Sequence, residues 1–177
     1  MKKYLCLLLC MFLVMSLDAQ NWKPVSTSIS FKTKMLGVTV DGHFSGFVGV
    51  IRFNPNDLTT AYLVGSVEAS TIDTDNSLRN KHLKEKEEFF QVQKFPTLKM
   101  KSIKIERDGT NYVGVFELTM KGITKVIRMP FTFKQEGNVG VFDGHSTINR
   151  KEWAVGGSTF GMSSDVAIHV LINAVQN

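Results

Sequence analysis

The sequence predicts an all-β domain, an eight-stranded antiparallel sheet closed into a barrel, with a short helix or ordered lid segment around 76–90. Three observations predict it: eight stretches with alternating polarity, short turns between most of them, and two shifts of phase. The clearest pair, 111–120 and 123–134, is joined by Lys121-Gly122. Each of these stretches has one apolar and one more polar face, because side chains alternate across a strand. Closure would remove the exposed sheet edges that favour aggregation.

The first residues have the features of an export signal. Lys2 and Lys3 precede an uncharged apolar run, and Ala19 is a plausible cleavage point. The run is about 14 residues long, shorter than the roughly 20 that a membrane-spanning helix needs. We therefore expect a signal peptide at 1–19, a barrel domain at 20–177, a periplasmic or secreted location, and no membrane-spanning segment.

Composition excludes several other classes. Both cysteines, Cys6 and Cys10, lie in the signal segment, so the mature chain would have no disulfide, thiol nucleophile or thiolate metal site. The net charge is +5, but the basic residues are spread along the chain. Their one local concentration, in 79–86, also contains an acidic residue. Nucleic-acid binding is therefore not expected, because it normally requires a basic stripe on a recognisable fold.

The elements follow from the alternation and the turn signals. The expected strands are Ser28–Thr33, Val38–Phe53, Ala61–Thr71, Thr97–Glu106, Asn111–Met120, Ile123–Lys134, Val139–Asn149 and Asp165–Ala174. Phase slips near Lys101-Ser102 and across Gly46 predict bulges, by which coiled sheets turn corners. The helix is expected within 76–90, capped by Asn76 or Ser77, at one mouth of the barrel.

Catalytic and metal motifs are not apparent. The four histidines, His43, His82, His145 and His169, lack the spacing of a zinc motif, so no metal site is predicted. Gly157-Ser158 has no strand-to-helix context for a nucleophile, so no catalytic residue and no enzymatic activity are predicted. A hydrolase or isomerase that used His82 or His145 would need a carboxylate within hydrogen-bond reach of the imidazole.

Aromatic residues are the remaining signal. The chain has 13 phenylalanines, and several fall on the apolar parity of the expected strands. An eight-stranded barrel can be filled by its side chains or can hold one small ligand, and composition alone does not decide between the two.

Motifs spread along the mature chain resemble the YceI-like polyisoprenoid-binding family. Residues 118–125, LTMKGITK, resemble the family's "LT-x-x-G-V-T-K" hairpin, and 42–53 resemble its "G-x-F-x-x-F…I-x-F" strand. Residues 72–96 are similar to "I-x-T…RD-x-HL…FF…YP", with Asn80 in place of the usual Asp. Residues 147–153 are similar to "INR-x-x-F", with Trp153 in place of the Phe.

The resemblance implies a lipocalin-like barrel, exported in bacteria, that binds an isoprenoid without catalysis. On this hypothesis the ligand is a polyisoprenoid, a quinone or a fatty lipid, with no cofactor, and a homodimer is possible. The apolar tail would contact Phe31, Phe44, Met100, Phe116, Leu118, Met129, Phe131 and Phe142. The rim and head-group residues would be Arg79, His82, Phe89 and Phe90. Arg150 is expected to bind carbonyls at a barrel end, with head-group binding as its second role.

The alternative is a filled barrel that acts as an interaction or stress-response module in the cell envelope without a bound lipid. Tight packing of side chains throughout the barrel interior would favour this second hypothesis.

Overall fold

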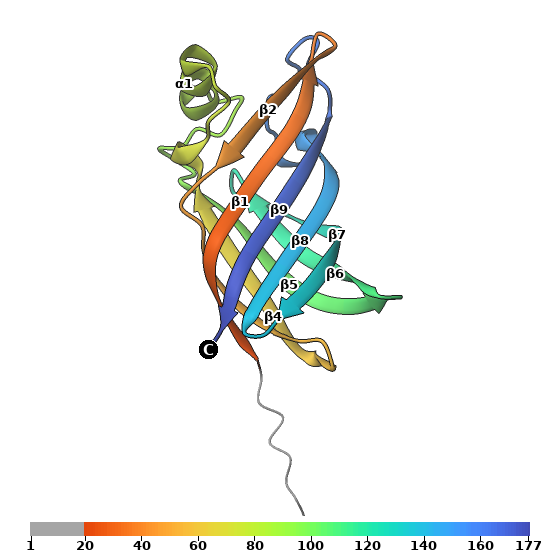
Figure 1. The fold of residues 1–177 in the computed structure, drawn as a ribbon. Coiled ribbons are helices and arrows are strands. Elements are labelled where there is room, and N and C mark those ends of the chain that lie inside the picture. Colours follow the sequence, from red (N-terminus) through yellow and green to blue (C-terminus); the bar gives the residue numbers. More distant parts are fainter. Residues whose placement is uncertain (1–19) are drawn as a thin grey trace, which may run out of the picture.

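The computed structural model describes residues 20–177, so the expected signal peptide lies outside the described residues. Nine antiparallel strands form one sheet (Figure 1). In chain order they are β1 (Asn21–Met35), β2 (Val38–Phe44), β3 (Val48–Asn54), β4 (Asp57–Glu68), β5 (Thr97–Asp108), β6 (Asn111–Met120), β7 (Ile123–Glu136), β8 (Val139–Asn149) and β9 (Asp165–Gln176). Pairing of β1 with β9 closes the barrel, which confirms the predicted fold class.

The strand β1 joins two parts of the wall. Near its start it pairs with β3 at Asn21 and Trp22, and its second half, from Ile29 onward, pairs with β2. Eight strands therefore close the barrel, and β2 is an additional strand beside the upper half of β1. Prediction missed the start of β1 by seven residues, because Pro24 and a bulge between Pro24 and Ser26 interrupt its alternation.

The stretch Val38–Phe53 was predicted as one strand, and this prediction was wrong. It forms β2 and β3, which are separated by Ser45, Gly46 and Phe47. Gly46 adopts a left-handed conformation, with φ of +69°, which ends β2 instead of forming a bulge within one strand. The second predicted phase slip is a true bulge: the register of β5 against β6 shifts between Ser102 and Lys104.

Alternation places the apolar residues inside the barrel as predicted. On β6, every even-numbered position from Tyr112 to Met120 is buried. On β7, Ile127, Met129 and Phe131 are buried. The link Lys121-Gly122 has positive φ at both residues, as a type I′ turn requires, and it holds the two strands in register.

Aromatic side chains fill the lower end of the barrel, where the C-terminus lies in Figure 1. Phe53 is fully buried, and its ring lies 5.0–5.9 Å from four other aromatic rings. The Trp22 indole donates to the Phe53 carbonyl at 2.8 Å and crosses Gly140, where a Cβ atom would lie 2.6 Å from the indole. We call this group the aromatic plug; its members are Trp22, Phe53, Tyr112, Phe131, Phe133 and Phe142.

A short helix lies at the opposite end of the barrel, beside β2 in Figure 1. This helix, α1 (Ser77–Glu85), begins after Asn76, whose side chain accepts a hydrogen bond from the backbone of Arg79. The predicted helix and its cap at Asn76 are thus confirmed. Two 3-10 turns, η1 (Ala69–Thr71) and η2 (Arg150–Trp153), also lie at strand ends. No helix among residues 20–177 is long and apolar enough to cross a membrane.

Candidate ligand-binding cavity

The upper part of the barrel encloses a cavity of about 200 Å³. Strands on all sides of the barrel line it, and its lining is almost entirely apolar. Along β8 the lining runs from Phe142 to Ile148, six residue steps, or about 20 Å at the usual rise of a strand. The interior is thus divided, with a packed lower end and an open upper part.

All eight side chains predicted to contact an apolar tail line this cavity: Phe31, Phe44, Met100, Phe116, Leu118, Met129, Phe131 and Phe142. Phe131 and Phe142 also belong to the aromatic plug, so they form the floor of the cavity. Phe31 and Phe44 lie near the mouth, where Phe44 contacts Phe90 edge-to-face at 5.7 Å.

Sequence reasoning missed several further residues that line the cavity. Ile168, Val170 and Ile172 of β9 line the cavity, as do Leu63 and Leu98. Period-two alternation in the predicted strand Asp165–Ala174 carried the signal for the β9 residues.

A second pocket, of about 380 Å³, lies at the mouth, between the β1–β2 hairpin and α1. Arg79, His82 and Phe89, three of the four predicted rim residues, line this rim pocket. The fourth, Phe90, lines the inner cavity instead. Four residues line both spaces, Phe31, Thr33, Leu83 and Met162, so the rim pocket adjoins the inner cavity.

The rim segment is held by polar contacts of its own. Arg79 donates from Nε to the Thr74 hydroxyl at 2.8 Å and from Nη2 to the Thr74 carbonyl, and Thr74 is buried. Asn80 donates to Asp73 Oδ1 at 2.7 Å, and this hydrogen bond is the main cause of a lowered pKa for Asp73. Much of the Arg79 donor capacity thus anchors the segment, which sequence reasoning did not foresee.

Arg150 fastens the loop at the other side of the mouth. It is 2% exposed and donates to the carbonyls of Val155, Gly157, Met162 and Ser163 at 2.6–3.2 Å. Burial lowers the pKa of Arg150. The expected carbonyl-binding role of Arg150 is therefore confirmed. Nearby, the Trp153 indole donates to the Leu118 carbonyl at 2.9 Å.

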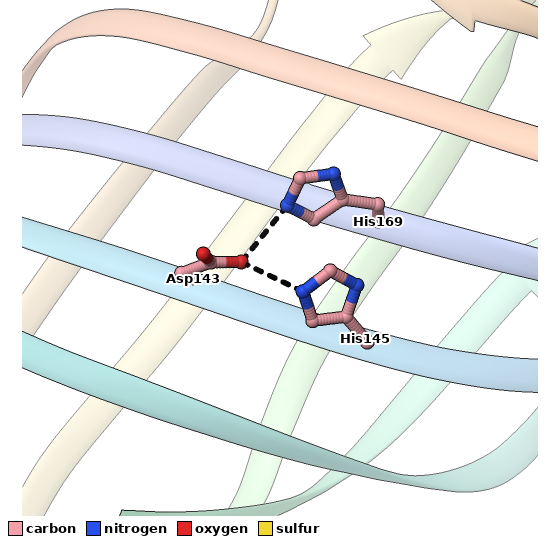
Figure 2. A group of neighbouring side chains, drawn as sticks. All are labelled: Asp143, His145 and His169. Atoms are coloured by element: carbon pink, nitrogen blue, oxygen red, sulfur yellow. Dashed lines mark hydrogen bonds and ion pairs between the residues drawn. The ribbon is translucent and has the colours of Figure 1, made fainter.

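A second group of polar side chains lies on the outer wall, away from the cavity (Figure 2). Asp143 and His145 of β8 and His169 of β9 converge there, with both imidazoles within 3.0 Å of one Asp143 oxygen. Sequence reasoning missed this cluster, although Asp143 and His145 are two residues apart and so share a face of the strand. The carboxylate that a catalytic His145 would require is therefore present, but on the outside of the barrel.

These observations define a closed eight-stranded β-barrel with an apolar interior cavity. The sequence model of the YceI-like domain family matches residues 21–174, and the chain belongs to this family. A UPF0312 protein of Pectobacterium atrosepticum and one of Yersinia pestis are each 25% identical over 155 residues, which cover 84% of this chain and 80% of theirs.

Solved structures share the fold. BcnA of Burkholderia cenocepacia superposes with a TM-score of 0.80 at 23% identity, over 84% of this chain and 96% of BcnA. A polyisoprenoid-binding domain from Saccharophagus degradans, implicated in plant cell wall breakdown, superposes with a TM-score of 0.68 at 12% identity. That match covers 90% of this chain and 99% of the domain.

Proposed function

We propose that this protein binds one long-chain lipid, an isoprenoid, a quinone or a fatty species, in the inner cavity and does not catalyse a reaction. The observation that carries the proposal is the apolar cavity above the aromatic plug. Transfer of a chain from water into such a space contributes roughly 0.8 kcal/mol per methylene group. Affinity can therefore arise without specific polar contacts. The name of the Saccharophagus degradans domain, which shares the fold, supports an isoprenoid as the first ligand to test.

The ligand would lie with its tail against the eight cavity residues and its polar head in the rim pocket. Support comes from the four residues shared by the two spaces, which make the cavity and the rim pocket adjacent. His82 and Lys86 supply polar groups on the α1 side of the rim pocket, and Arg79 contributes there as far as its bonds to Thr74 allow. Phe89 and Phe90 would flank the passage between head and tail.

Binding without catalysis is supported by the lining itself. Among the cavity residues in 20–177, Lys99 and Arg150 are the charged ones, and Arg150 is already engaged by four carbonyls. An acid–base pair of the kind a hydrolase needs is thus not part of the described lining. The features of residues 1–19 support a periplasmic or secreted location, where the protein would carry, store or sense the lipid.

A matched pair of variants tests the proposal. Met100→Trp places a large ring in the cavity, whereas Lys101→Trp places the same ring on the exposed outer face of β5. The affinity of delipidated protein for a prenol is measured by the displacement of a fluorescent fatty acid. This affinity should fall strongly in Met100→Trp and stay unchanged in Lys101→Trp. Equal binding by a folded Met100→Trp variant and the parent would refute the cavity as the site. Failure of the parent to bind any prenol, quinone or fatty acid would favour the interaction module instead.

A further inference from the structure

The outer wall of the barrel carries an arrangement that lipid binding does not use. His145 and His169 are directly opposite each other in the β8–β9 register, and Asp143 lies two residues from His145 on the same strand. The intervening Gly144 and the neighbouring Phe142 are buried, so Asp143 and His145 point outward. Two adjacent strands of a closed barrel thus hold three potential metal ligands on one exposed face.

The side chains are already brought together. Asp143 Oδ1 lies 2.8 Å from His169 Nε2 and 3.0 Å from His145 Nε2. The imidazole rings stack with centroids 4.1 Å apart and planes 11° from parallel. Both Nε2 atoms point toward the same carboxylate, as Figure 2 shows. The three ligand atoms lie within 4.8 Å of one another.

We propose that Asp143, His145 and His169 form a surface site for a divalent late transition-metal ion, with Zn²⁺ as the ion to test. Two imidazoles and a carboxylate are ligands that zinc takes in proteins, with zinc–nitrogen and zinc–oxygen distances of about 2.0–2.2 Å. Ligand atoms of a tetrahedral site with such bonds are about 3.3 Å apart. Binding would require Asp143 to move outward by a few tenths of an ångström. It would also require the two imidazoles, which lie in nearly parallel planes, to turn so that both Nε2 lone pairs point at one ion. The partial exposure of all three side chains to solvent permits these movements.

The ligand chemistry selects the class of ion. Imidazole nitrogen suits zinc, copper and nickel, whereas magnesium and calcium prefer sites made of oxygen alone. In the structure each ring is placed to donate its Nε2 proton to Asp143. On binding, the ion would take the place of these protons, and each neutral ring would carry its proton on Nδ1.

Three ligands leave one tetrahedral position open. The side chains are 65%, 40% and 35% exposed for His145, Asp143 and His169, so this position faces solvent. Water or a ligand from another molecule would complete the coordination. The ion would also tie β8 to β9 on the outside of the barrel, independently of any lipid inside.

Competition for Zn²⁺ between untagged mature protein and a chromogenic indicator tests the proposal. We expect one ion per chain, and we expect His145→Ala and His169→Ala each to weaken binding at least ~10-fold. Asp143→Asn, which keeps a hydrogen-bond acceptor but loses the charge, should also weaken it. His43→Ala, on the exposed β2, is the matched control and should bind like the parent.

A spectroscopic readout makes the assignment independent of affinity. In nitrogen-correlated NMR spectra, Zn²⁺ should shift the Nε2 resonances of His145 and His169 and leave those of His43 and His82 in place. The proposal is overturned if the parent does not compete with the indicator, or if the cluster variants bind as the parent does. Circular dichroism would check that these surface variants remain folded. Neither outcome for zinc affects the lipid-binding test, because the cluster lies on the outside of the barrel.

Discussion

Replacement of Phe53 by Ala should destabilise this protein strongly, whereas replacement of Phe44 by Ala should not. Phe53 is 0% exposed and contacts four rings of the aromatic plug. Removal of a fully buried phenylalanine side chain costs about 3–5 kcal/mol, and the four ring contacts place Phe53→Ala near the upper end of that range. In a domain of this size, 1 kcal/mol shifts Tm by about 2–4 °C, so we expect a fall of about 10–15 °C.

Phe44 is the matched control, because it is also an aromatic residue of a barrel strand but lies at the cavity mouth. Its ring is partly buried and contacts two rings, Phe31 and Phe90, each at 5.7 Å. Loss of these contacts should cost about 1–2 kcal/mol. Thermal unfolding of delipidated protein, followed by circular dichroism, measures both variants. Equal losses of Tm would contradict this prediction, because they would mean that the upper interior is packed as tightly as the aromatic plug.

Two further predictions concern the mouth of the barrel. Asn80→Asp would put a second carboxylate 2.7 Å from Asp73. In the parent the pKa of Asp73 is lowered, so its contribution to stability is present above its unfolded pKa of about 3.8 and is lost as pH falls. In the variant, repulsion between the two carboxylates should raise the pKa of the pair. The loss of Tm relative to the parent should therefore be largest near neutral pH and shrink in acid. A loss of Tm that does not depend on pH would contradict this prediction. Arg150→Met should lower stability by about 3 kcal/mol or more in urea unfolding, because buried carbonyls left without donors cost about 1–3 kcal/mol each. Lys151→Met, at the exposed neighbouring position, should have little effect on stability. Equal losses of stability in the two variants would argue against the role of Arg150 in binding the loop carbonyls.

The strands and the inward face could be predicted because their information is local. On β6 and β7 the period-two pattern and the Lys121-Gly122 turn fix both the pairing and the inward parity. Period-two alternation also placed the eight predicted tail-contact residues on the cavity wall, although it missed others that line the cavity. It did not show that Phe131 and Phe142 form the floor of the cavity, because the ring contacts of the aromatic plug join residues from five strands.

The errors arise where distant parts of the chain meet. The break of Val38–Phe53 at Gly46 follows from a change of pairing. β2 pairs with the second half of β1, whereas β3 pairs with β4 and with the start of β1. The Asp143–His145–His169 cluster depends on the register between β8 and β9, and a motif search based on helical spacing does not detect it. Arg79 lines the rim pocket, but its hydrogen bonds to Thr74 could not be foreseen, because they depend on the fold of the turn before α1.

Lipid binding is tested most simply by native mass spectrometry of the mature protein, purified without detergent and then extracted with organic solvent. We expect a mass increment that corresponds to one lipid per chain. The extract should contain an isoprenoid, a quinone or a fatty species, and Met100→Trp should lack the increment. A parent protein that is free of lipid, and that remains so after incubation with prenyl lipids, would contradict the proposed binding function.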